Sequence, residues 1–243
     1  MSTMPGAIAT TCRRSDAKPI SVPMRCLPGL LLALCAPPLL AADPCDELPK
    51  PAVSVKRLEE QVSINTTYGY KSLTNIGAKA VRPGRDVLGL TRGNATARFA
   101  IELPLVVDNT NRWECASPQI TLTYGFTPVT LYVAREFPEG TCAHQEIYAH
   151  EQRHLKTYQA HMSSLEKSFQ DTLSARLAGN RVWRGPAGQT APRLQRELDE
   201  RWLPYIQREI AKVEAAQALI DTPEEYDRVA NACDGEIAKR LKK

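Results

Sequence analysis

The spacing of apolar residues changes part-way along the chain, from a period of two to a helical period. Residues 120–124 and 129–133 alternate apolar side chains with threonine and tyrosine, which predicts two strands. Glycine and proline within residues 125–128 predict a turn that joins these strands into a β-hairpin. Residues 53–70, rich in Val, Ile, Thr and Tyr, predict one or two more strands, and residues 94–107 predict a longer one.

Helical patterns dominate after residue 140. From Cys142 to about Leu177 the chain contains no proline or glycine, which predicts one long helix with Thr141 as its N-cap. Residues 192–220 predict a second helical stretch, bent near Pro204 because proline interrupts the hydrogen-bond ladder of a helix. Residues 222–225, Thr-Pro-Glu-Glu, have the pattern of a capping box and predict the start of a last helix.

These elements predict an α+β fold. We expect residues 43–140 to be mainly β and to form a small, mostly antiparallel sheet packed on the long helix. Residues 141–243 are expected to be mainly α and to supply a helical C-terminal half. The two parts together are long enough to share one hydrophobic core, so we expect a single domain over residues 43–243.

The first 42 residues are typical of a signal peptide. Arg25 precedes an apolar run over residues 27–40, and Ala41-Ala42 offers small residues at a cleavage point before Asp43. Met24 is an alternative start codon, because residues 1–23 add no apolar segment of their own. Three prolines interrupt the apolar run, which is also too short to cross a membrane well. We therefore expect an exported protein, periplasmic or secreted, with no stable membrane span in the mature chain.

Charge argues against a nucleic-acid partner. The whole chain has 31 basic and 27 acidic side chains. Residues 1–42 hold four of the basic and one of the acidic side chains, which leaves a net charge of +1 on the remainder. A nearly neutral mature chain lacks the basic surface that phosphate binding requires, so no nucleic acid is expected.

Four cysteines remain after residue 42: Cys45, Cys115, Cys142 and Cys233. An even number of cysteines in an oxidising compartment predicts two disulfides. Three pairings are possible. We favour Cys115 with Cys142, which are close in sequence, and Cys45 with Cys233, which would tie the two ends together.

The chemistry of the chain is concentrated in His150-Glu151-Gln152-Arg153-His154, an HExxH pentapeptide inside the predicted long helix. Residues four apart share a helix face, so His150 and His154 can both ligate one zinc ion (Zn²⁺). Glu151 then lies beside the metal and is the candidate general base. Because all four histidines of the chain fall between residues 144 and 161, chance is a poor explanation of the motif.

The third zinc ligand is expected from the returning helix. His161 shares the helix face, but seven residues place it roughly 10 Å further along the axis, beyond the reach of a shared ion. If the two long helices form an antiparallel hairpin, the residues opposite the motif lie near position 218. That register selects Glu214 and Asp221 first, of which we favour Glu214, and the other acidic candidates are Glu209, Glu224, Glu225 and Asp227.

Residues 120–165 resemble an uncharacterised group of secreted bacterial proteins assigned as zinc-dependent proteases. The similarity is carried by residues 131–137, which lead into Cys142, and by Ala149 with the HExxH motif. Tyr226-Asp227 is loosely similar to a tyrosine-aspartate element of that group, whereas Arg153 replaces a glycine that is frequent there. The resemblance implies a zincin-like domain and a metallopeptidase activity.

Motif and resemblance together predict a zinc-dependent hydrolase, specifically a metallopeptidase, that acts on a peptide or protein substrate. An alternative of another class is a non-catalytic envelope protein whose helices bind a partner. In that protein His150 and His154 would hold metal for a structural purpose, or would be the vestige of a metal site.

Overall fold

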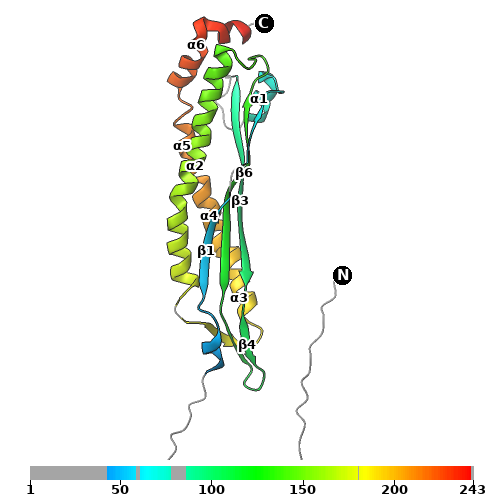
Figure 1. Cartoon of the computed structure of the whole chain (residues 1–243), viewed down its shortest axis with the longest axis vertical. Helices are drawn as coiled ribbons and strands as arrows, with labels where there is room; N and C mark the ends of the chain where they lie inside the picture. Colours follow the sequence, from blue (N-terminus) through cyan, green and yellow to red (C-terminus); the bar gives the residue numbers. More distant parts are fainter. Residues whose placement is uncertain (1–42, 59–60, 78–85, 180, 242–243) are drawn as a thin grey trace, which may run out of the picture. The chain divides into compact units, whose positions relative to one another are not determined.

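A long strand and a long helix organise the computed structural model of this chain, which describes residues 43–58, 61–77, 86–179 and 181–241. Strand β6 (Gln119–Val133) lies beside helix α2 (Cys142–Leu177), and the two share one apolar core (Figure 1). The α+β class is confirmed. The predicted signal peptide, residues 1–42, lies outside the described residues.

Strand β6 is the centre of a mixed sheet. Strands β1 (Ala52–Arg57) and β2 (Val62–Asn65) pair in parallel with successive parts of one edge of β6. Strand β3 (Gly89–Glu102) pairs antiparallel with the other edge over its whole length. A second, antiparallel sheet contains β4 (Leu105–Asp108), β5 (Trp113–Ala116) and β7 (Trp183–Pro186). The short helices η1 (Pro44–Glu47) and α1 (Tyr70–Gly77) complete the first half.

The predicted β-hairpin is wrong, because residues 125–128 lie inside the single strand β6. These glycine and proline residues lie where one edge of β6 stops pairing with β1 and starts pairing with β2. The Leu58 N–H donates to the Tyr124 carbonyl at 2.9 Å, and the Val129 N–H donates to the Gln61 carbonyl at 3.0 Å. On the opposite edge the register of β3 shifts between Gly93 and Ala95. Glycine and proline therefore mark an irregularity in the strand here, which is their other common role in sheets.

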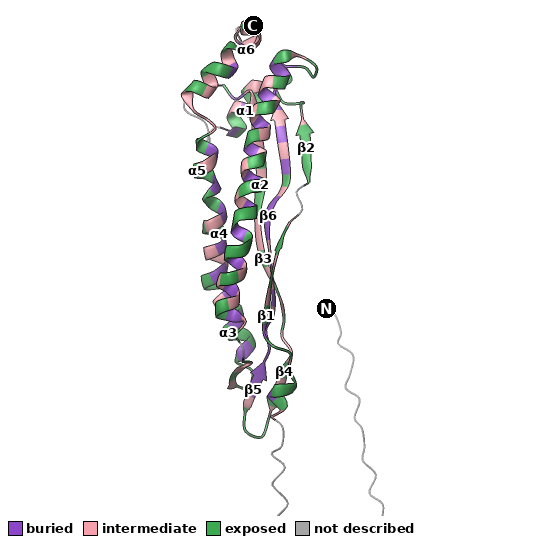
Figure 2. Ribbon diagram, turned by 60° about the vertical axis from the view of Figure 1, so that its left-hand side comes forward, coloured by how far each residue is buried: buried purple, intermediate pink, exposed green. Residues whose placement is uncertain are grey.

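The long helix is confirmed over Cys142–Leu177, and Thr141 is its N-cap, since its Oγ1 accepts from the His144 N–H at 3.2 Å. The chain then returns beside α2 through α3 (Thr190–Glu197), a π-helical turn η2 (Leu198–Trp202), α4 (Leu203–Ala211) and α5 (Val213–Ala218) (Figure 2). The break at η2 and α4 agrees with the bend predicted near Pro204. Helix α6 (Pro223–Leu241) is kinked at residues 232–235, and Thr222 caps its start, since Thr222 Oγ1 accepts from the Glu225 N–H at 3.2 Å.

Two disulfides are present, as predicted, but the favoured pairing is wrong. The bonds are Cys45–Cys115 and Cys142–Cys233 rather than Cys115–Cys142 and Cys45–Cys233. The reason is the 15-residue length of β6, which joins Cys115 to the segment before α2. A strand of that length spans roughly 50 Å at about 3.3 Å per residue, far beyond the reach of a disulfide. Closeness in sequence is therefore misleading when an extended strand intervenes.

The buried face of α2 is one continuous stripe with two kinds of residue. Towards its C-terminal end the stripe is apolar: Met162, Phe169, Leu173 and Leu177 pack on β6 and on the returning helices. Towards its N-terminal end the same stripe includes His144, Glu151 and His154. A polar side chain at a core position needs a partner or a function, so this half of α2 is where a site is expected.

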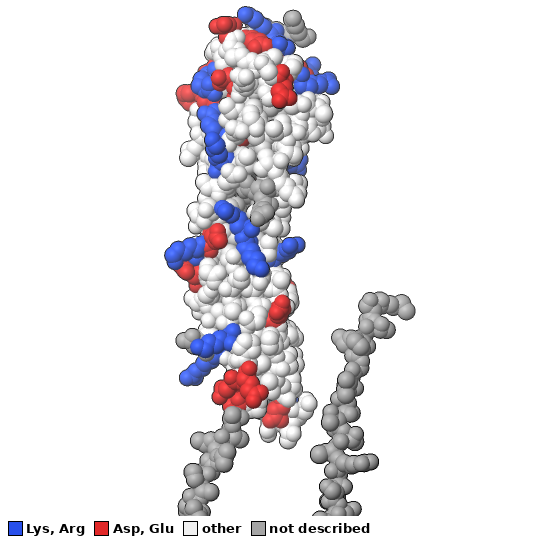
Figure 3. All heavy atoms as spheres, viewed as in Figure 1, with Lys and Arg blue, Asp and Glu red and all other residues white. Residues whose placement is uncertain are grey.

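The surface shown in Figure 3 carries acidic and basic side chains interspersed with one another, without a large area of a single sign. Among the described residues, no helix is both long enough and apolar enough to cross a membrane.

Candidate metal centre

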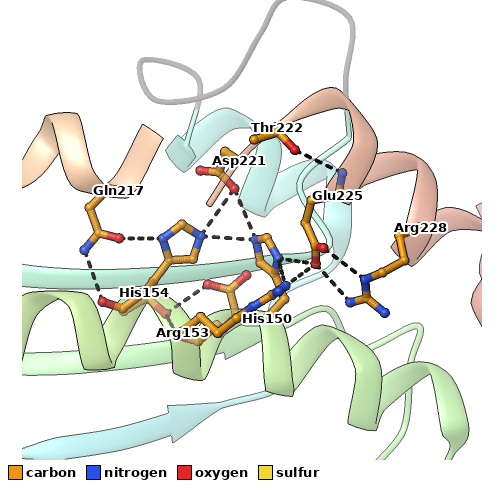
Figure 4. A network of polar contacts seen from close by, with 10 residues as sticks. His150, Arg153, His154, Gln217, Asp221, Thr222, Glu225 and Arg228 are labelled. Carbon is orange, nitrogen blue, oxygen red and sulfur yellow. Dashed lines mark hydrogen bonds and ion pairs between the residues drawn. The ribbon is translucent and has the colours of Figure 1, made fainter. Parts of the chain in front are cut away.

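Three candidate metal-ligand atoms lie close together at the HExxH motif, two from helix α2 and one from the segment just before α6 (Figure 4). His150 and His154 lie one turn apart on α2, and their Nε2 atoms are 3.1 Å apart. Asp221, just before α6, places Oδ1 at 3.1 Å from the Nε2 of His150 and 3.3 Å from that of His154. In the described part of the chain these residues form one group whose ligand atoms fit around a single ion.

The triangle formed by these three atoms has the dimensions of a zinc site. Ligand atoms bound at about 2.0 Å to a tetrahedral zinc lie about 3.3 Å from one another. The three observed separations are 3.1, 3.1 and 3.3 Å. Two imidazoles and one carboxylate are also a ligand set of catalytic zinc, which retains an open position for water or substrate. These residues therefore fit the ion in both spacing and chemistry.

The outer nitrogens of both histidines are held by side chains from the returning segment. Gln217 on α5 donates its Nε2–H to the His154 carbonyl at 3.1 Å, which fixes the orientation of the amide. Its Oε1 therefore accepts from Nδ1 of His154, at 2.6 Å. The Nδ1 of His150 lies 3.1 Å from Oε1 of Glu225. Such outer hydrogen bonds fix the tautomer and ring orientation of metal-binding histidines.

Glu225 is itself held by two arginines. Arg228 donates to both of its oxygens at 2.9 Å, and Arg153 contacts Oε1 while also lying 3.0 Å from Nδ1 of His150. Hydrogen bonding from Arg228, and then from Arg153, holds the pKa of Glu225 well below its usual range. Glu225 therefore stays ionised and keeps accepting from His150.

This arrangement directs unprotonated nitrogens at Asp221. Once Nδ1 of a neutral His154 donates to Gln217, its Nε2 carries a lone pair that faces the Asp221 carboxylate. Lone pairs and a carboxylate repel one another unless a cation or added protons lie between them. Burial opposes charge on His154, but the Asp221 hydrogen bond, the nearby Glu151 carboxylate and the Gln217 hydrogen bond together outweigh it and raise the pKa of His154. The centre thus attracts positive charge.

Glu151 lies on the buried side of the same turn and is 3% exposed. Burial raises the pKa of its carboxyl above the ordinary value, and the nearby His154 and His150 only partly offset this effect. The Thr91 hydroxyl on β3 lies 2.9 Å from both Oε2 and the main-chain carbonyl of Glu151. Gly89 on the same strand leaves room for the carboxyl, since a Cβ there would lie 2.5 Å from Oε1. Strand β3 therefore holds Glu151 in place.

A cavity of about 330 Å³ borders this group. Helix α2, the start of β3, α5 and α6 all contribute to its lining, which includes His150, Glu151, His154 and Asp221. A volume near the lower end of the range for ligand sites, roughly 300–1,000 Å³, suits a short part of a substrate.

The structure selects among the predicted third ligands. Asp221 joins the histidines, whereas Glu214 lines the cavity with an exposed side chain outside the group. Asp227 is likewise outside the group, and Glu225 bonds to the outer nitrogen of His150 instead. His161 is engaged elsewhere, since its Nε2–H donates to the Glu209 carbonyl at 2.9 Å. The expectation that His161 is not a ligand agrees with this contact.

Gln217 and Thr91 are the residues that sequence reasoning missed. Gln217, Asp221 and Glu225 recur every fourth residue, so they follow the spacing of His150 and His154 on the facing helix. That pattern is a usable signal for Gln217. Thr91 comes from a strand 60 residues upstream and has no such signal.

Comparison with known proteins supplies no relative: no family model matches the chain, and no curated protein or solved structure matches it. The resemblance to secreted zinc-dependent proteases therefore stays a prediction. The chemical interpretation of the centre rests on the contacts described above.

Proposed function

We propose that this protein is a zinc-dependent hydrolase, and specifically a metallopeptidase that acts on a peptide or protein substrate. The observation that carries the proposal is the triangle of His150 Nε2, His154 Nε2 and Asp221 Oδ1, with sides of 3.1–3.3 Å. The buried Glu151 beside it supplies the second element that hydrolysis needs, which is a group able to accept and return a proton.

Each part of the chain has a distinct role in this proposal. His150, His154 and Asp221 would hold the zinc, which supplies a Lewis acid and lowers the pKa of water. Glu151 takes up the proton of the attacking water, and its raised pKa lets it pass that proton to the leaving amine. Thr91 keeps the Glu151 carboxyl in place, while Gln217 and Glu225 fix the two imidazole rings.

The two disulfides are consistent with an exported protein. We place the enzyme in the periplasm or outside the cell, because disulfides persist in those oxidising compartments. Disulfides at both ends also suit a protein that works where proteases are common.

The test is hydrolysis of an unfolded protein by the zinc-loaded chain. Glu151→Gln should retain the zinc and lower kcat/KM by about 10²–10⁴-fold, the usual contribution of a general base. Glu166→Gln is the matched control, since Glu166 is an exposed residue of the same helix that does not line the cavity, and it should stay close to the wild type. Bound zinc without any hydrolysis would favour the non-catalytic alternative, a helical interaction protein with a structural metal.

A further inference from the structure

The cavity beside the metal group changes character along α2. From the C-terminal side towards the N-terminal side, α2 contributes Tyr158, His154, Glu151 and then Ile147 to its lining. On the facing segment the order is Gln217, Asp221, Glu225 and then Val229. Beyond the metal group, towards the start of α2, the lining is therefore apolar.

Buried residues form this apolar part. Val87, Ile147 and Ile237 are each at most 4% exposed, and Val229 is 9% exposed. They belong to the second apolar cluster of the molecule, which connects the start of α2, the start of β3 and α6. The Cys142–Cys233 disulfide links the first residue of α2 to α6 at the same end. The apolar part is thus a preformed wall rather than a set of loose surface side chains.

All the charged residues that line the cavity are acidic. They are Asp86, Glu151, Glu214, Asp221 and Glu225, and no lysine or arginine lines it among the described residues. A zinc ion would balance two of these charges, and the arginines that pair with Glu225 do not line the cavity. Recognition of a carboxylate or phosphate normally uses arginine or lysine. With zinc in place and Glu225 paired to arginines, an anionic group would meet the remaining charges of Asp86 and Glu214 and no cationic side chain in the lining.

We propose that this cavity receives a large apolar side chain of a peptide, next to the bond that is cleaved; this inference rests on the proposed hydrolase function. The same lining rejects aspartate, glutamate and a free C-terminal carboxylate at that place. The protein is therefore not a carboxypeptidase, and it cleaves beside Leu, Ile, Val, Met or Phe.

Ala230 on α6 offers a way to fill the cavity, since it lines the cavity and is only half-buried. Ala230→Leu adds volume without removing a core contact. Ala238→Leu is the matched control, because Ala238 lies in α6 after its kink at residues 232–235, is also half-buried and does not line the cavity. The first variant should change which bonds are cleaved, and the second should not.

The first experiment digests reduced β-casein with the zinc-loaded protein and identifies the products by mass spectrometry. Large apolar residues should flank the cleaved bonds. Ala230→Leu should slow cleavage at these bonds by about 10-fold or more and favour bonds beside smaller side chains. Ala238→Leu should reproduce the wild-type pattern. Removal of single residues from the C-terminus, or cleavage beside Asp or Glu, would overturn the inference and leave the hydrolase proposal intact.

A binding experiment gives a readout that does not depend on turnover. Leucine hydroxamate and aspartate hydroxamate share the same metal-binding group and differ only in side chain. Calorimetric titration of the zinc-loaded protein should show leucine hydroxamate binding at least about 10-fold more tightly, and Ala230→Leu should remove that difference. Equal affinities, or a preference for aspartate, would overturn the inference. Bound zinc with no hydrolysis of β-casein would instead overturn the hydrolase proposal, and this inference with it.

Discussion

Glu114 and Glu151 are equally buried, each 3% exposed, yet their surroundings differ in kind. Glu114 on β5 accepts the backbone N–H groups of Gly188 and Thr190, at 2.7 and 2.6 Å. Burial alone would raise the pKa of Glu114, but these hydrogen bonds outweigh it and hold the pKa below its usual range. The carboxylate of Glu151 accepts a hydrogen bond from the Thr91 hydroxyl, and burial raises its pKa.

The difference fits a structural role for Glu114 and the proposed role of Glu151 as a general base. Glu114 satisfies the backbone at the start of α3 and stabilises the end of the molecule where the second sheet lies. Glu151 is buried with incomplete compensation, which costs stability in the metal-free protein. A group that must exchange a proton gains from that arrangement, because its pKa moves towards neutral pH. Burial is therefore common to both carboxylates, and the small number of hydrogen-bond donors is what makes Glu151 the candidate for proton transfer.

The largest expected effect comes from the two disulfides, one at each end. Replacing either pair of cysteines by serine should lower the free energy of unfolding by about 2–5 kcal/mol, because the bonds close loops of 70 and 91 residues. Chemical denaturation of the two double variants measures this loss. Only Cys142→Ser with Cys233→Ser should also weaken zinc binding, since this bond anchors α6 beside Asp221 and Glu225.

The pair Cys45–Cys115 serves as the control for that experiment, since it lies next to Glu114 and away from the metal group. Equal loss of zinc affinity in both double variants would show that general destabilisation, rather than the position of α6, controls the centre.

The two glutamates should respond in opposite ways to the same substitution. In metal-free protein at pH 7, Glu114→Gln should lower the free energy of unfolding by about 1–3 kcal/mol, because an ionised acceptor of two backbone N–H groups is lost. Glu151→Gln should leave that free energy unchanged or raise it, since it removes a poorly compensated buried charge. Urea denaturation of both variants measures the two values. A large loss of stability in Glu151→Gln would contradict the interpretation of Glu151 as a poorly compensated buried carboxylate that serves in proton transfer.

A smaller effect should appear in the pH dependence of stability of the metal-free protein. The pKa of Glu114 is lowered by folding, so its contribution is complete above the unfolded value of 4.5 and is lost as pH falls through the folded pKa. The pKa of Glu151 is raised, so its contribution is present below 4.5 and is lost as pH rises through the folded pKa. Glu151→Gln should therefore flatten the curve above pH 4.5, and Glu114→Gln should flatten it at acid pH. Identical curves for both variants would contradict these assignments.

The sequence predicts those features of the fold that depend only on residues close together in the chain. The bounds of α2 follow from a run without proline or glycine and from the Thr141 cap. The capping role of Thr222 is equally local. The hairpin prediction fails because β3 pairs with β6 on both sides of residues 125–128, while β1 and β2, far upstream in the chain, pair with its other edge before and after them. No local pattern states which distant strand completes an edge.

The residues of the candidate site also fall into two groups, those with a local sequence pattern and those brought in by long-range packing. His150, Glu151 and His154 are recognisable because their spacing is set by one helix. Counting residues along an antiparallel hairpin leads to Glu214 and Asp221, and the structure places Asp221 at the histidines. Counting residues does not choose between Glu214 and Asp221. The chain that returns beside α2 contains a π-helical turn and a break before α6, and both change which side chains face α2. Thr91 and Gly89 depend on the packing of β3 against α2, which is a long-range contact.

The most direct test of the account is the zinc content and zinc affinity of protein purified without a metal-binding tag. The wild type should hold about one zinc per chain. Asp221→Ala should weaken zinc binding by more than the roughly 10–100-fold expected from loss of an outer hydrogen bond, as in Gln217→Ala, and Glu214→Ala should bind zinc like the wild type. A wild type without zinc, or an Asp221→Ala variant that binds zinc as tightly as the wild type, would contradict the proposed metal centre.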